Sequence, residues 1–301
     1  MQLMGAAMRP VVRFAMRRAS DPKAMRRHFA ISAKLWFRHV PFSLFLPTTF
    51  GPRKAEALWV SAEPTSHSKV LLYFHGGGYL AGSPHTHKMV VARLSRMAGL
   101  RAFVPSYRLA PEHPLSAACE DADLAFEHLL SKGYRAQDIV LGGDSAGGGI
   151  ALGLLARLCQ RGQPPAGCFA WSPFCDQSFS GDSIQENGDK DHFFPGDRVE
   201  DLAERILGGA DPKDPKISPL FAAYPNCPPV FLQVSDSEIL RDDSVRMDQK
   251  LRAEGAQCQL EVYSAAPHVW HLFDGWFPEA RAAIRKTAAF VNSLPPLSDD
   301  S

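Results

Sequence analysis

Residues 138–149 read DIVLGGDSAGGG, and five of these twelve residues are glycine. A short apolar run (139–141) leads into Gly143-Asp144-Ser145-Ala146-Gly147, and a helix-like segment follows. Gly-x-Ser-x-Gly between a strand and a helix is typical of a sharp turn that lifts a serine hydroxyl above a sheet. The glycines remove β-carbons that would clash there. A plain glycine-rich turn would look the same, so the interpretation depends on whether the chain supplies a base, an acid and an anion hole.

Short apolar runs alternate with helical patterns around this stretch. Strands are predicted at 70–74, 102–104, 139–141, 168–171, 230–234 and 259–263. Strand–helix alternation indicates an α/β fold with a mostly parallel sheet and helices on both faces. From about residue 175 to 223 no strand is predicted, but there is a helical patch at 199–207. An insertion of this kind in an α/β enzyme is typical of a lid over the site.

The composition excludes several classes of function. The chain has 301 residues, 45% of them hydrophobic and 22% charged, with a formal net charge of +1. A near-neutral balance gives no electrostatic support for nucleic-acid binding. No apolar run approaches the roughly 18 residues that a membrane span needs. The six cysteines show neither Cys-x-x-Cys nor zinc spacing, so we expect reduced thiols, no metal and a cytoplasmic location.

Residues 1–20 carry four arginines, no acidic residue and interleaved apolar residues. The preferred interpretation is an amphipathic helix that packs on the protein by its apolar stripe; a membrane-surface helix and an organelle presequence are the alternatives. We therefore expect N-terminal cap helices over 1–45 and a catalytic domain over 46–301, with the cap insertion at about 175–223.

Four motifs together resemble one family, the hormone-sensitive-lipase-like carboxylesterases, or bacterial family IV, of the α/β-hydrolase superfamily. The motifs are His75-Gly76-Gly77-Gly78, Tyr107-Arg108-Leu109-Ala110-Pro111-Glu112, Gly143-Asp144-Ser145-Ala146-Gly147-Gly148, and Ser218-Pro219-Leu220 followed by Pro228-Pro229-Val230. The resemblance covers roughly residue 70 to the C-terminal helix. It implies an eight-stranded sheet with a helical cap, and hydrolysis of short- to medium-chain acyl esters through an acyl-enzyme without a cofactor.

The resemblance also implies roles for the residues around the serine. Ser145 is the expected nucleophile, and Gly76, Gly77 and Ala146 are expected to donate backbone N–H groups to the oxyanion. His75 and Asp144 are expected to support these groups rather than to react.

The base and the acid are expected in the chain order Ser, acid, His that the fold uses. His268, just after the last predicted strand, matches the family's base, with His271 as the alternative. Many members carry Asp-Pro-Leu-x-Asp before the helix that follows the acid. Aligned on Leu240, the family's aspartate falls on Glu238 here; the alternative acid is Asp236.

Other functions remain open at this stage. An amide hydrolase, like the related arylacetamide deacetylases, would use the same triad. A non-catalytic binding protein, like the plant gibberellin receptors, lacks the base, whereas His268 is present here. His85 and His87 could suggest a metal site, but we expect an exposed helix start there. The expected partner is a small-molecule ester, without nucleic acid or stable membrane insertion; a homodimer stays open.

Overall fold

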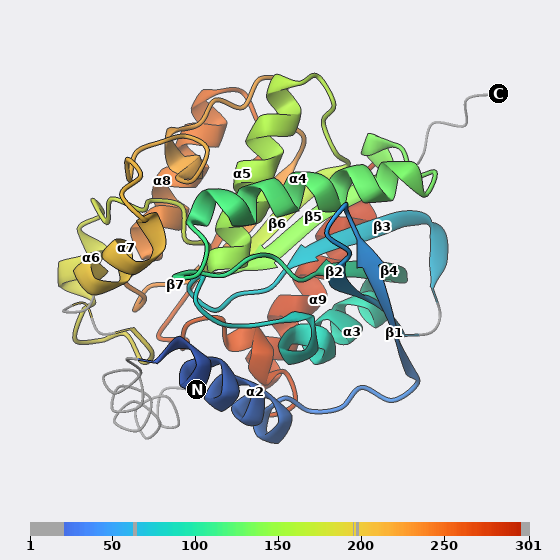
Figure 1. The fold of residues 1–301 in the computed structure, drawn as a ribbon, viewed down its shortest axis with the longest axis horizontal. Helices are drawn as coiled ribbons and strands as arrows, with labels where there is room; N and C mark the ends of the chain where they lie inside the picture. Colours follow the sequence, from blue (N-terminus) through green and yellow to red (C-terminus); the bar gives the residue numbers. More distant parts are fainter. Residues whose placement is uncertain (1–20, 63–64, 195, 197–198, 296–301) are drawn as a thin grey trace.

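The computed structural model of the chain describes residues 21–62, 65–194, 196 and 199–295. One eight-stranded sheet runs through it in the order β1-β2-β4-β3-β5-β6-β7-β8 (Figure 1). The strands are β1 (Ser43–Phe50), β2 (Ala55–Ala62), β3 (Ser66–Phe74), β4 (Leu100–Pro105), β5 (Ile139–Asp144), β6 (Gly167–Trp171), β7 (Val230–Ser235) and β8 (Cys258–Tyr263). The β1/β2 and β2/β4 pairs are antiparallel, and β4, β3, β5, β6, β7 and β8 are mutually parallel. The predicted mostly parallel α/β sheet is confirmed.

Helices cover both faces of the sheet. The α-helices are α2 (Pro22–Trp36), α3 (Pro84–Ala98), α4 (Leu115–Ser131), α5 (Ala146–Gln160), α6 (Ser183–Glu186), α7 (Val199–Leu207), α8 (Arg241–Ala253) and α9 (Pro278–Ser293); short 3₁₀ turns are η1 (Ala136–Asp138), η3 (Pro219–Phe221) and η4 (Trp270–Phe273). Side chains of α4, α5 and α8 share one apolar core, and those of α3 and α9 share the other. This double cover explains why β5, β6 and β7 are buried along their whole lengths.

The longest strand-free stretch among the described residues lies between β6 and β7 and holds α6, α7 and η3 (Figure 1).

Near the N-terminus of the described chain, Arg26 anchors α2 to the rest of the protein. Its guanidinium donates to the carbonyl oxygens of Leu80 (2.8 Å) and Ala110 (2.8 Å) and pairs with the Glu112 carboxylate. The expected boundary at residues 45/46 falls inside β1, and residues 1–20 lie outside the described part of the chain.

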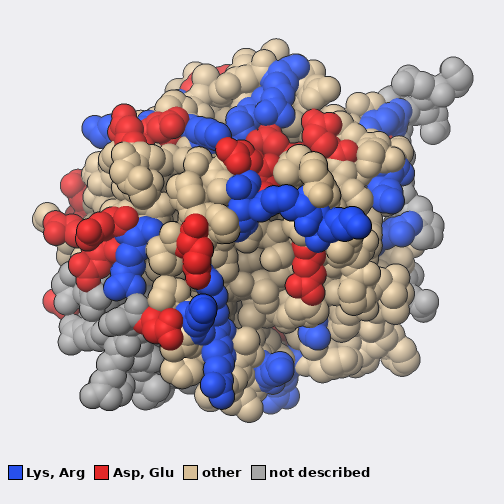
Figure 2. All heavy atoms as spheres, in the orientation of Figure 1, with Lys and Arg blue, Asp and Glu red and all other residues tan. Residues whose placement is uncertain are grey.

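Charge is dispersed on the face that carries α4 and α2, where basic and acidic side chains alternate (Figure 2). Charged side chains of the described residues also form ion pairs, as Arg157 does with Asp123 and Arg241 with Glu186. Within the described residues, no helix combines the length and the apolar character needed to cross a bilayer.

Candidate active site

Ser145 stands on a strained turn between β5 and α5. Its backbone has φ 53° and ψ −123°, a conformation that costs a residue with a side chain on the order of 1–3 kcal/mol. The flanking glycines make the turn possible. A β-carbon at Gly143 would lie 2.4 Å from the carbonyl oxygen of Gly147, and one at Gly147 would lie 2.1 Å from that of Phe74. The predicted sharp strand-to-helix turn is therefore present, and its geometry is that of a nucleophile elbow.

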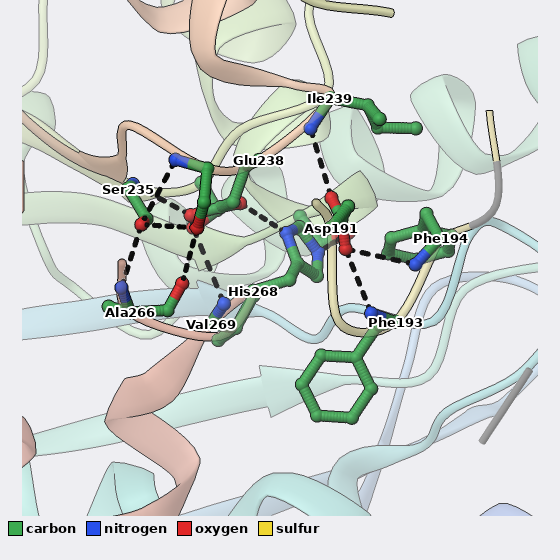
Figure 3. Close-up of polar contacts among 12 residues, drawn as sticks. Asp191, Phe193, Phe194, Ser235, Glu238, Ile239, Ala266, His268 and Val269 are labelled. Carbon is green, nitrogen blue, oxygen red and sulfur yellow. Dashed lines mark hydrogen bonds and ion pairs between the residues drawn. The ribbon is translucent and has the colours of Figure 1, made fainter. Parts of the chain in front are cut away.

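The loops after β7 and β8 bring Glu238 and His268 to this serine. His268 Nε2 lies 2.9 Å from Ser145 Oγ, and His268 Nδ1 lies 2.5 Å from Glu238 Oε2. The other oxygen of Glu238, Oε1, accepts hydrogen bonds from Ser172 Oγ (2.9 Å) and from the Ser235 N–H (2.8 Å), as Figure 3 shows in part. All three side chains are buried, so the line Ser145–His268–Glu238 is held in a fixed, low-dielectric setting.

The charge state of His268 is set by opposing effects. Burial lowers the pKa of His268, but the Glu238 carboxylate, with smaller contributions from Asp191 and Asp144, raises it more, so the net shift is upward from 6.5. Phe194 packs edge-on against the imidazole, with ring centroids 4.8 Å apart. A base of this kind is neutral above its pKa and gains stabilisation from the carboxylate when it accepts a proton.

The alternatives for base and acid lie elsewhere. His271 is buried, stacks on Trp171 at 4.3 Å and contacts Gln233 Oε1 at 3.0 Å; burial lowers its pKa well below the usual value. Asp236 is exposed and accepts a hydrogen bond from the N–H of Ala265 (2.7 Å). Ser145 and His268 therefore come together with Glu238, and neither alternative joins them.

The glycine loop after β3 requires one correction. The N–H of Gly76 donates to Asp144 Oδ1 at 3.0 Å, and the Tyr73 hydroxyl donates to the same oxygen at 2.7 Å. The Gly76 N–H is thus committed to a buried carboxylate, and it is not free to serve an oxyanion. Gly77 has φ 129°, and a β-carbon there would lie 2.3 Å from the carbonyl oxygen of Ala81. Ala146 is the first residue of α5, where a backbone N–H has no intrahelical acceptor.

A second correction concerns His87, which the sequence placed at an exposed helix start. His85 is exposed, but His87 is fully buried, with Nε2 3.3 Å from Asp144 Oδ2, and it stacks near His75. Burial lowers the pKa of His75 to about 3. His87 thus contacts the Asp144 carboxylate behind the glycine loop, and His75 Nδ1 lies 3.0 Å from the carbonyl oxygen of Gly76 within the loop itself. Among the described residues, no group of His, Cys, Asp and Glu has an arrangement that could hold a metal ion.

Sequence reasoning missed the polar side chains that hold the acid in place. Ser172 follows β6, and Asn187 and Asp191 belong to the insertion between β6 and β7. They contact Glu238 or its loop across 48 to 66 residues of sequence. Nothing local in the sequence marks them, because single Ser, Asn and Asp residues are common in loops.

Comparison with known proteins agrees with this geometry. Residues 71–272 match the family described as having the alpha/beta hydrolase fold. An acetyl-hydrolase of Streptomyces hygroscopicus is 35% identical over 226 residues, which cover 75% of this chain and 76% of that protein. A mutant of the esterase E40 superposes with a TM-score of 0.92 at 32% identity, covering 97% and 98% of the two chains. An esterase of the bacterial hormone-sensitive lipase family gives 0.89 at 33%, covering 96% and 97%.

The chain belongs to the α/β-hydrolase family. Within that family it is a hormone-sensitive-lipase-like carboxylesterase, a serine hydrolase of carboxylic esters, as its sequence motifs imply.

Proposed function

We propose that this carboxylesterase works through Ser145 as nucleophile, His268 as general base and acid, and Glu238 as the carboxylate that orients the histidine. The observation that carries the proposal is the unbroken line of contacts from Ser145 Oγ through both imidazole nitrogens to Glu238 Oε2. That line fits a neutral histidine with its proton on Nδ1, donated to the carboxylate, and with Nε2 accepting from the serine hydroxyl.

Each step of the reaction has a group to perform it. Ser145 Oγ attacks the ester carbonyl while His268 Nε2 takes the hydroxyl proton. His268 then gives that proton to the leaving alkoxide, and the acyl group stays on the serine. Water then attacks the acyl carbon while His268 takes its proton, and His268 returns that proton to Ser145 Oγ as the acid leaves, which restores the enzyme. Glu238 accepts the hydrogen bond from His268 Nδ1 throughout and stabilises the imidazolium.

The oxyanion needs donors that are not committed elsewhere. We propose the N–H groups of Gly77 and Ala146. Gly78, whose α-carbon faces open space, offers the next N–H along the same loop. Asp144 fixes this loop from behind through Gly76. Loss of one such donor in other hydrolases costs about 10²–10³ in kcat.

The proposed substrates are short- to medium-chain acyl esters of small alcohols or phenols. The insertion between β6 and β7, together with α2, is proposed to form the cap that limits the acyl chain. Phe194 of that insertion already touches the imidazole, which supports a partly apolar wall beside the reacting atoms. Amide hydrolysis on the same triad is the second candidate, since both reactions use the same groups.

A cytoplasmic location is proposed because all six cysteines are free thiols and five of them are buried.

A homodimer is proposed as the form in solution. The outer edge of β8 has no strand beyond it among the described residues, and its Val262 is half exposed. Light scattering coupled to size exclusion decides between monomer and dimer.

The test is a panel of p-nitrophenyl esters from acetate to palmitate with a matched anilide, applied to the wild type and to Ser145→Ala. We expect hydrolysis of the shorter esters and near-background rates for the variant, whose fold is checked by circular dichroism. More than a few per cent of wild-type turnover in Ser145→Ala would remove the serine from its role. Preferential cleavage of the anilide would make the protein an amidase.

A further inference from the structure

The acid loop, residues 236–240 between β7 and α8, carries Glu238 and is held from outside by the cap insertion. At its start the loop is tied to the sheet, because the Asp236 N–H donates to Tyr263 O at 2.9 Å. Around Glu238 the backbone bonds are longer: the Glu238 N–H donates to Ser235 O at 3.3 Å, and the Arg241 N–H to Glu238 O at 3.2 Å. A glutamate also has one more rotatable side-chain bond than the aspartate common in the family, so more conformations must be restricted to hold its carboxylate in one place.

Asn187 supplies the first external contact. Its side-chain amide donates two hydrogen bonds, one to Asp236 O and one to Glu238 O, each 2.8 Å long. The side chain is 1% exposed, so water cannot replace these bonds. Because an amide presents two donors on one nitrogen, Asn187 fixes two carbonyls of the acid loop relative to each other.

Asp191 supplies the second contact from the same turn, since its own N–H donates to Asn187 O at 2.8 Å. Its Oδ2 accepts from the Ile239 N–H at 2.9 Å, and its Oδ1 accepts from the N–H groups of Phe193 (2.8 Å) and Phe194 (3.0 Å), as Figure 3 shows. One buried carboxylate therefore bonds to the acid loop on one side and, on the other, fixes the segment whose Phe194 ring packs on His268.

We propose that Asn187 and Asp191 are positioning residues: they hold the backbone of the acid loop so that Glu238 reaches His268, which makes the catalytic geometry depend on the cap insertion. The proposal rests on the function proposed for Glu238 above. It assigns to the insertion a task beyond covering the substrate, because the same turn bonds to the acid loop and packs against the base.

The role predicts a particular kinetic change in Asn187→Ala and Asp191→Asn. A displacement of the carboxylate by about 1 Å should lower kcat by about tenfold to a hundredfold, with KM for p-nitrophenyl butyrate within about twofold of wild type. A weaker contact with Glu238 also leaves burial as the dominant influence on the pKa of His268. The acid limb of kcat/KM should therefore move to lower pH.

One control variant separates this role from loss of stability. Asp176→Asn removes another buried carboxylate of the same insertion, which bonds to Ser178, Ser180 and Arg246 rather than to the acid loop. It should lower the melting temperature without moving the acid limb. If Asn187→Ala does not fold, Asp191→Asn carries the test through kcat alone and through the same cycle with Glu238→Ala, because it keeps the size of the side chain but also removes a charge that raises the pKa of His268 directly.

A double-mutant cycle decides the mechanism. If Asn187 acts through the acid, Asn187→Ala should lower kcat in the wild type but change it by less than about twofold in a Glu238→Ala background. An equal loss in both backgrounds, or an unchanged kcat and acid limb in both single variants, overturns the proposal and leaves the triad standing. Full activity of Glu238→Ala itself would overturn the triad, and the positioning role with it.

Discussion

The neighbours of Glu238 determine which type of side chain can stand at this position. Its two oxygens meet three donors, the imidazole on Oε2 and Ser172 with Ser235 on Oε1. All three donors can be satisfied at once only by a group that accepts on both oxygens, which an ionised carboxylate does and an amide does not. The glutamate is therefore chemically equivalent to the aspartate of other family members, although its backbone must stand further from the base.

The first prediction compares the two candidate acids. Glu238→Gln keeps the shape but presents an N–H₂ group to a donor, which favours the wrong histidine tautomer, so kcat should fall by up to about 10⁴. Asp236→Asn should change kcat by less than about threefold, because Asp236 is exposed and bonds only to the loop at Ala265 among the contacts described. The reverse ranking, measured with p-nitrophenyl butyrate, would move the acid to Asp236.

The second prediction concerns pH. The pKa of His268 is raised from 6.5, and the base works only when neutral, so kcat/KM should rise with pH through an acid limb whose midpoint lies above 6.5. His271→Asn serves as the control. The pKa of His271 is far below neutrality, so this variant should leave the midpoint in place. A midpoint clearly below 6.5 in the wild type would contradict the balance of effects at His268.

At the scale of elements, the pattern of neighbouring residues predicts the strands that are buried on both faces, and it fails for the β1–β2 hairpin at one edge of the sheet. The six predicted strands all form. Five of them lie inside the sheet, where a strand buried on both faces is a continuous apolar run, and the sixth, β8, is the outer strand with half-exposed residues. The β1–β2 hairpin was not located. In β1 the apolar Leu44 and Leu46 are about half exposed, so the strand lacks the alternation of buried apolar and exposed polar residues that marks such an edge.

In the candidate site, too, some residues can be predicted from short motifs, and others depend on contacts between residues far apart in sequence. The elbow and the base follow from short motifs, whereas the status of the Gly76 N–H is decided by Asp144, 68 residues away in sequence. The motif alone cannot reveal which of three consecutive glycines has its N–H already bonded. Asn187 and Asp191 were out of reach for the same reason, because their partners are backbone atoms of a distant loop.

The third prediction tests how α2 is fastened. Arg26→Ala removes bonds to two carbonyl groups and to Glu112, so the free energy of unfolding should fall by about 1–3 kcal/mol, measured by denaturant unfolding. Arg27→Ala, one residue along the same helix at an exposed position, should change it by less than about 0.5 kcal/mol. Equal effects of the two substitutions would show that Arg26 does not anchor the helix.

On the scale of the whole molecule, the site is assembled at the carboxyl ends of the parallel strands. Ser145, Glu238 and His268 follow β5, β7 and β8, whose carboxyl ends point the same way because the strands are parallel. The insertion after β6 enters at this same edge, next to the acid loop. The parallel sheet thus fixes the side from which the three reacting side chains approach, and the loops and the insertion after β6 adjust their positions.

The last prediction asks whether α2 belongs to the cap. Three of the contacts between the helix and the body are Arg26 at Leu80, Phe29 against the His87 ring at 5.8 Å, and Trp36, whose carbonyl accepts from Trp276 Nε1 at 2.7 Å. Deleting residues 1–40 removes all three but no member of the proposed triad. The melting temperature should fall by about 5–10 °C.

Rates with p-nitrophenyl acetate should stay within about tenfold of wild type in this deletion, because the truncation leaves the reacting groups in place. The preference among longer acyl chains should change, because the truncation removes part of the proposed cap that limits the acyl chain. Deleting residues 1–20 alone is the matched control, since it leaves α2 and its three contacts in place. A 1–40 deletion with unchanged melting temperature and unchanged chain-length preference would show that α2 neither stabilises the body nor shapes the acyl site.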